Sequence, residues 1–110
     1  MFEPSIKEKV TKYINDHKIM IFTKSYCHFC AKVKNLFSSL KSPFQFLDLD
    51  LIGDGEEIQN HLFQMTNQKG VPSVWIGGNF IGGSDTVFEM KNTGKLFSIL
   101  KENGIPFIEE

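Results

Sequence analysis

The chain has 110 residues, a formal net charge of −1 and 41% apolar residues. We expect residues 1–110 to form a single domain, because this length suffices for one hydrophobic core without disulfides. A net charge near zero argues against general nucleic-acid binding, and the lack of a long apolar run or a secretion signal argues against a membrane partner.

The first half of the chain predicts two helices that alternate with two strands. Apolar residues at helical spacing predict a helix over residues 4–17, with a proline near its start. The apolar run in residues 18–23 predicts a strand that is buried on both faces. One-face apolar spacing predicts a helix over residues 27–40, and after a turn at 41–43 we expect a second strand over residues 44–49.

The second half predicts a loop, a helix, a β-hairpin and two short helices, over residues 50–54, 55–66, 73–81, 85–91 and 95–103. Gly77-Gly78-Asn79 forms the expected hairpin turn, and the acidic pair Glu56-Glu57 suits the first turn of a helix. This order predicts an α/β fold in which a four-stranded mixed sheet is flanked by helices on both faces.

Both cysteines of the chain, Cys27 and Cys30, fall where the first predicted strand meets the following helix. Unpaired backbone N–H groups and the helix dipole favour a thiolate at that position. Cys30 lies one turn further along the same helix face, close enough for a disulfide after a small adjustment. We interpret Cys27 as the nucleophile and Cys30 as its partner, and such a pair in a chain without a secretion signal fits a reducing compartment. We expect a cytoplasmic location from the lack of targeting signals alone.

Other interpretations of the cysteine pair are weaker. A zinc site needs four ligands, and the histidines at positions 17, 28 and 61 lack ligand spacing, so we expect no metal in the monomer. A structural disulfide would close a very short loop and constrain little. A buried, inert pair stays open on the motif alone.

The lysines are concentrated in the first half of the chain. Residues 1–47 carry eight lysines and three acidic residues, a net +5, whereas residues 48–110 carry four lysines and ten acidic residues, a net −6. The cysteine pair therefore lies in the basic half, which favours a thiolate and an anionic thiol substrate. A solvated surface explains most of these lysines without any binding role.

A Cys-x-x-Cys motif beside a βαβ pattern is typical of a thioredoxin-like redox module. With Lys24 before the cysteines, Val71-Pro72, and the segment Gly82-Gly83-Ser84-Asp85 in the same order, the chain closely resembles a glutaredoxin over nearly its whole length. Thioredoxin is a poorer match, because it has Trp before the first cysteine and Gly-Pro between the pair.

The resemblance implies a thioredoxin-like fold and a glutathione-dependent thiol–disulfide oxidoreductase that is mainly monomeric. The implied partners are glutathione, disulfide-bearing and glutathionylated proteins, and indirectly glutathione reductase with NADPH. Glutathione contacts are implied for nine residues: Lys24, Tyr26, Phe29, Gln59, Val71, Pro72, Gly83, Ser84 and Asp85.

In this resemblance each glutathione contact has a defined role. Lys24 and Gln59 meet carboxylate groups, and the backbone of Val71, before a cis proline, pairs with the glutathione backbone. Backbone N–H groups after Gly83 hold the γ-glutamyl carboxylate, and Asp85 meets the α-amino group. Purely structural explanations stay open beside these roles. Lys24 would then be a solvated lysine at a strand end, Gln59 an exposed helix glutamine, Pro72 a proline at a strand edge, and Ser84 or Asp85 a helix cap.

Two departures from the family pattern bear on function. Thr86 stands where many dithiol members carry an aspartate, and Asp85 is the acid instead. His28-Phe29 replaces the usual Pro-Tyr between the cysteines. Two interpretations of His28 stay open: its protonated ring favours the Cys27 thiolate, or its side chain simply points to solvent. Some members without that proline bind a [2Fe–2S] cluster between two subunits with two glutathiones, so a Cys27-ligated cluster carrier or sensor is the alternative function.

Overall fold

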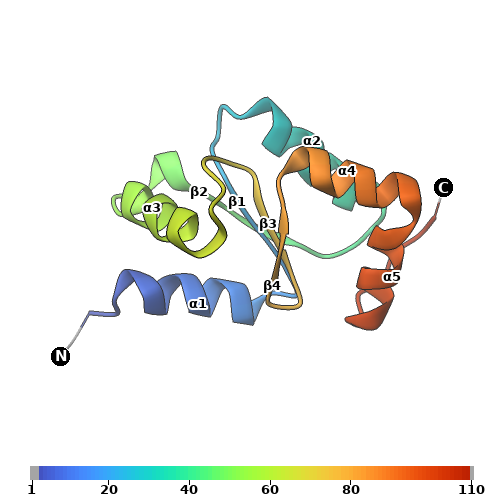
Figure 1. The fold of residues 1–110 in the computed structure, drawn as a ribbon, viewed down its shortest axis with the longest axis horizontal. Helices are drawn as coiled ribbons and strands as arrows, with labels where there is room; N and C mark the ends of the chain where they lie inside the picture. Colours follow the sequence, from blue (N-terminus) through green and yellow to red (C-terminus); the bar gives the residue numbers. More distant parts are fainter. Residues whose placement is uncertain (1–2, 110) are drawn as a thin grey trace.

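A computed structural model describes residues 3–109 and contains one four-stranded sheet with helices around it (Figure 1). The elements follow in the order α1 (Ile6–Asp16), β1 (Ile19–Thr23), α2 (His28–Ser39), β2 (Gln45–Asp48), the 3₁₀ helix η1 (Leu49–Leu51), α3 (Gly55–Thr66), β3 (Ser73–Ile76), β4 (Asn79–Gly82), α4 (Ser84–Thr93) and α5 (Lys95–Glu102). The predicted order of helices and strands is confirmed. The 3₁₀ helix lies partly in the segment predicted as a loop.

The strands lie in the order β2-β1-β3-β4. β1 pairs in parallel with β2 and antiparallel with β3, and β3 pairs antiparallel with β4. Because α2 connects the parallel pair, it must cross one face of the sheet. The predicted mixed sheet is therefore confirmed.

The central strand β1 is buried along its whole length, as predicted, and it divides the core into two layers. Ile19 and Ile21 pack with apolar residues of α2, α4 and α5, whereas Met20 and Phe22 pack with those of α1 and α3. Alternate residues of a strand point to opposite faces, so the two helix groups cover opposite faces of the sheet. Figure 1 shows α1 and α3 together on one side and α2 with α4 on the other.

Helix starts differ in detail from the sequence expectation. α1 begins after Ser5, whose hydroxyl accepts a hydrogen bond from the Glu8 N–H while the Glu8 carboxylate accepts one from the Ser5 N–H. This capping box has a recognisable Ser-x-x-Glu sequence. α4 begins at Ser84 with Gly83 at the cap position, and it has no side-chain capping bond. A capping role for Ser84 or Asp85 is therefore wrong.

Asp54 lies at the cap position of α3, but its side chain does not cap the helix. Its carboxylate instead accepts a 2.6 Å hydrogen bond from the Lys9 ammonium and so ties α3 to α1.

Within residues 3–109, no helix combines the length and apolar character needed to cross a membrane.

Candidate active site

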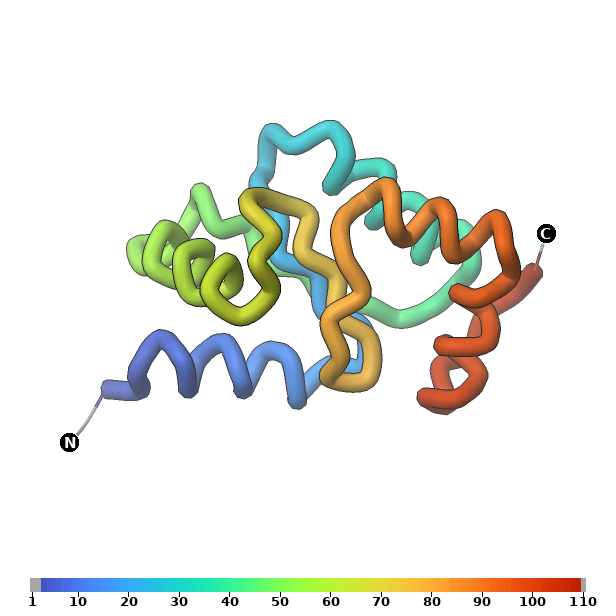
Figure 2. Tube along the Cα trace, in the orientation of Figure 1, coloured from blue at the N-terminus to red at the C-terminus, as the bar shows by residue number. Residues whose placement is uncertain are grey.

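Three segments that are far apart in the sequence meet at one end of the sheet. They are the β1–α2 turn with the cysteines, the loop before β3 and the junction between β4 and α4, and Figure 2 shows all three in the upper half of the molecule. The hollow between them is lined from all three segments, by Phe29, Val71 and Gly83 among others.

Cys27 is the N-cap residue of α2. Its Sγ accepts a 3.2 Å hydrogen bond from the backbone N–H of Cys30, so an otherwise unpaired helix N–H points at the sulfur. The Sγ also lies 3.9 Å from the carbonyl oxygen of Val71. A helix N-terminus and a donated N–H both favour a negative sulfur, and Cys27 is partly exposed, so the geometry suits an accessible thiolate.

Cys30 lies in the opposite environment, because its side chain is completely buried. Burial and the hydrogen bond with Cys27 raise the pKa of the Cys30 thiol to about 12, and a hydrogen bond with the Lys24 backbone and the charge of Lys34 offset only part of this. The two thiols therefore differ in accessibility, and the raised pKa keeps the Cys30 thiol protonated at neutral pH.

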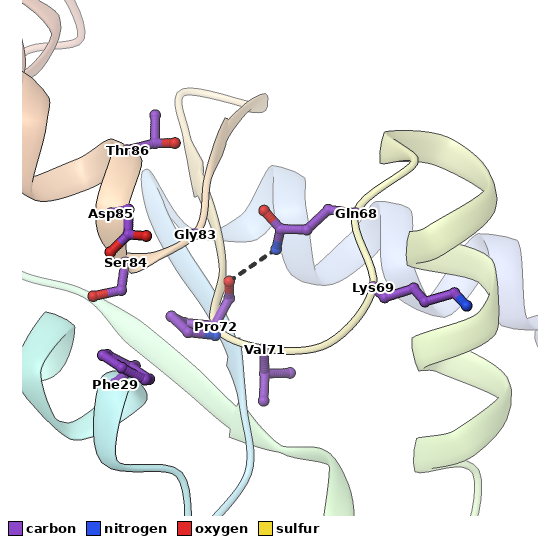
Figure 3. A pocket seen from close by; sticks show the side chains of 9 residues that line it. All are labelled: Phe29, Gln68, Lys69, Val71, Pro72, Gly83, Ser84, Asp85 and Thr86. Carbon is purple, nitrogen blue, oxygen red and sulfur yellow. Dashed lines mark hydrogen bonds between the residues drawn. The ribbon is translucent and has the colours of Figure 1, made fainter.

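A first open hollow, of about 320 Å³, contains six of the nine residues that the resemblance implied (Figure 3). They are Phe29 from α2, Val71 and Pro72 before β3, and Gly83, Ser84 and Asp85 at the start of α4. The Val71–Pro72 peptide bond is cis, as the resemblance implies. This hollow thus combines an aromatic wall, the backbone that precedes β3 and a helix N-terminus.

The same hollow includes Thr86 and two residues that the sequence analysis did not single out, Gln68 and Lys69. The Gln68 side-chain amide donates a 3.1 Å hydrogen bond to the carbonyl oxygen of Pro72, drawn as a dashed line in Figure 3. A Cβ atom at Gly83 would lie 3.3 Å from Oε1 of Gln68, so glycine suits this close approach. Lys69 points away from the others, towards α3. In the sequence, only the position of Gln68 and Lys69 shortly before Val71 could have indicated that they line this hollow.

The remaining implied residues, Lys24, Tyr26 and Gln59, line a second hollow. Tyr26 is 74% exposed and directly precedes Cys27, so the second hollow lies beside the reactive sulfur. Asp50 and Glu56 complete its polar lining. The structure therefore distributes the implied residues over two hollows, with the Cys27 segment contributing to both.

Asp50 is a site residue that the sequence analysis missed. One of its carboxylate oxygens accepts a 2.8 Å hydrogen bond from the backbone N–H of Ser25, and the other accepts one from the Ser25 hydroxyl. These bonds lower the pKa of Asp50 and tie the cysteine loop to the segment after β2. The contact joins residues 25 positions apart, so no local pattern indicates it.

His28 is exposed, and its ring lies 6.0 Å from the Phe29 ring in an edge-to-face arrangement. Both roles considered for it stay predictions. Within residues 3–109, no group of three or more His, Cys, Asp or Glu side chains is arranged to hold a metal ion.

The sequence of this chain is similar to those of known glutaredoxins. The sequence model of the Glutaredoxin family matches residues 19–81. Glutaredoxin-C1 of Arabidopsis thaliana is 40% identical over 99 residues, which cover 90% of this chain and 79% of that protein. Glutaredoxin-C2 of the same plant is 39% identical over 97 residues, which cover 88% of this chain and 87% of that protein.

Solved structures give the same result for the fold. A buckwheat glutaredoxin–glutathione complex matches with a TM-score of 0.89 and 40% identity over 92% of both chains. The holo form of glutaredoxin C1 from Populus tremula x tremuloides matches with a TM-score of 0.87 and 31% identity, over 91% of this chain and 99% of that one. The implied thioredoxin-like fold is thereby confirmed, and the chain belongs to the glutaredoxin family of thiol–disulfide oxidoreductases.

Proposed function

We propose that this chain reduces glutathione mixed disulfides and protein disulfides through the Cys27 thiolate, with glutathione as the reductant. The observation that carries the proposal is the contrast between the two thiols. Cys27 is accessible and receives a helix N–H on its sulfur, whereas Cys30 is buried with its pKa raised to about 12. Such a pair separates the attacking thiol from the one that acts later.

The first reaction needs Cys27 alone. Its thiolate attacks the glutathionyl sulfur of a mixed disulfide, a new S–S bond forms between Cys27 and glutathione, and the substrate leaves as a thiolate that takes up a proton. A second glutathione, as its thiolate, then attacks that sulfur and leaves as oxidised glutathione, which regenerates the Cys27 thiolate. Glutathione reductase returns oxidised glutathione to two thiols at the expense of NADPH.

Reduction of a protein disulfide uses both cysteines. Cys27 forms a mixed disulfide with the substrate, and the Cys30 sulfur, after losing its proton, attacks Cys27 and releases the substrate as a dithiol. The Cys27–Cys30 disulfide that remains is reduced by two glutathiones. The backbone hydrogen bond from Cys30 to the Cys27 sulfur supports this role, because it keeps the two residues within one helical turn of each other.

We place glutathione across both hollows, with its sulfur at Cys27. In the first hollow the Val71 backbone and the start of α4, from Gly83, face one end of the tripeptide. In the second hollow Lys24 and Gln59 face the glycine carboxylate at the other end. The match to a buckwheat glutaredoxin that binds glutathione supports this placement.

A [2Fe–2S] dimer is the alternative, and we favour the oxidoreductase over it. Cys27 is the one cysteine of the pair that is accessible, so four cluster ligands would require a second copy of the chain and two glutathiones. Cys30, placed against Cys27, has no part in that arrangement. We also propose a reducing, cytoplasmic location, since the cycle depends on reduced glutathione.

The test is to trap the first intermediate. Cys30→Ser protein treated with a glutathionylated peptide should accumulate one glutathione, and peptide mapping by mass spectrometry should place it on Cys27. Modification elsewhere, or none, would contradict the proposed nucleophile. An absorption spectrum of anaerobically purified wild-type protein tests the alternative, because visible cluster bands together with absent turnover would favour it.

A further inference from the structure

The second hollow holds a lysine and a carboxylate that do not pair. Lys24 and Asp50 both line it, yet none of the ion pairs formed within residues 3–109 includes Lys24. Elsewhere on the described surface, lysine and aspartate do join, as in Lys12 with Asp16 at 2.9 Å. The Asp50 carboxylate has other partners instead.

Both of these partners belong to Ser25. Its backbone N–H donates to one oxygen of Asp50 at 2.8 Å, and its hydroxyl donates to the other. Both carboxylate oxygens are thus engaged by the residue that directly follows Lys24. The pKa of Asp50 is lowered first by the Ser25 hydroxyl and next by the Ser25 N–H, while the charge of Lys24 is the weakest cause. Asp50 is ionised at neutral pH and is stabilised chiefly by Ser25.

We propose that Ser25 is a specificity-determining residue: by binding Asp50, it leaves the Lys24 ammonium free for a carboxylate of the thiol substrate. Ser25 acts through two other residues, so it is a positioning residue. The inference rests on the proposed function, because it needs Lys24 to meet the glycine carboxylate of glutathione.

Loss of the Ser25 hydroxyl has a definite expected effect. Ser25→Ala frees one oxygen of Asp50, which then pairs with Lys24 and competes with the substrate carboxylate. Exposed ion pairs are weak, so we expect kcat/KM for a glutathione mixed disulfide to fall by about two- to fivefold, through KM, with kcat unchanged. Ser25→Thr retains the hydroxyl and should behave as wild type.

A second substitution separates this mechanism from simple loss of loop structure. In the Ser25→Ala/Asp50→Asn double variant the competing charge is gone, so KM should return to about the wild-type value. A merely structural role predicts the reverse, because the double variant has lost more hydrogen bonds than the single one. Ser98→Ala, at an exposed position on α5, is the matched serine control and should leave KM unchanged.

The decisive readout compares two substrates, one with a charged glycine carboxylate and one in which that carboxylate is a neutral ester. One is a peptide glutathionylated with glutathione, and the other is the same peptide carrying the glycine ethyl ester of glutathione. Ser25→Ala should raise KM for the first substrate and leave KM for the ester at its wild-type value. Equal losses on both substrates, no loss on either, or no recovery in the double variant would overturn the proposal. Failure of the proposed function is seen separately, as a wild-type protein that turns over neither substrate.

Discussion

The buried position of Cys30 makes its attack on Cys27 strongly dependent on pH. With a pKa of about 12, the thiolate fraction of Cys30 at pH 7 is roughly 10⁻⁵. Once Cys27 carries glutathione, it no longer raises the pKa of Cys30 through its thiol hydrogen bond or its charge, but burial, the largest cause, persists. We therefore expect the rate of Cys27–Cys30 disulfide formation to increase about tenfold per pH unit over roughly pH 6 to 9.

The assay starts from protein whose Cys27 has been converted to the glutathione mixed disulfide. Samples are quenched with acid at intervals, and intact-mass spectrometry follows the loss of glutathione as the internal disulfide forms. Cys30→Ser protein is the control and should keep its glutathione at every pH. A closure rate that is already maximal near pH 7 would refute the reasoning, because Cys30 would then be ionised at neutrality.

Two further predictions concern stability. A Cβ atom at Gly55 would lie 1.7 Å from the Leu49 carbonyl oxygen, so Gly55→Ala should lower the free energy of unfolding by about 1–3 kcal/mol, whereas Gly53→Ala, with no atom within 4 Å, should change it by less than about 0.5 kcal/mol. Equal urea midpoints for the two variants would contradict this. Phe37→Ala removes a completely buried ring and should cost about 3–5 kcal/mol in the same urea titration, and a loss below about 1 kcal/mol would mean that this core position is misjudged.

The architecture was predictable because its signals are local. The apolar run of β1 indicated a strand buried on both faces, and the apolar spacing after Cys30 indicated α2; both are as expected. The 3₁₀ helix Leu49–Leu51 was missed because three residues are too few to show a periodic pattern. The capping box of α1 was missed although Ser5 and Glu8 have the spacing that indicates it.

The site was predictable where residues are adjacent in sequence or match the family pattern. The cysteine pair, the cis proline and the start of α4 fall into this class. The distribution of the implied residues over two hollows was not predictable, because it depends on how α3 and the cysteine loop meet. The role of Asp50 was hidden for the same reason, since its contact with Ser25 exists only in the folded chain.

The central claim is that Cys27 alone carries out the reduction of glutathione mixed disulfides. The most direct measurement is turnover of a small glutathione mixed disulfide, followed as NADPH consumption through added glutathione reductase, for wild type, Cys27→Ser and Cys30→Ser. The account predicts that turnover vanishes in Cys27→Ser and is retained in Cys30→Ser. Equal losses in the two variants, or turnover that survives in Cys27→Ser, would contradict it.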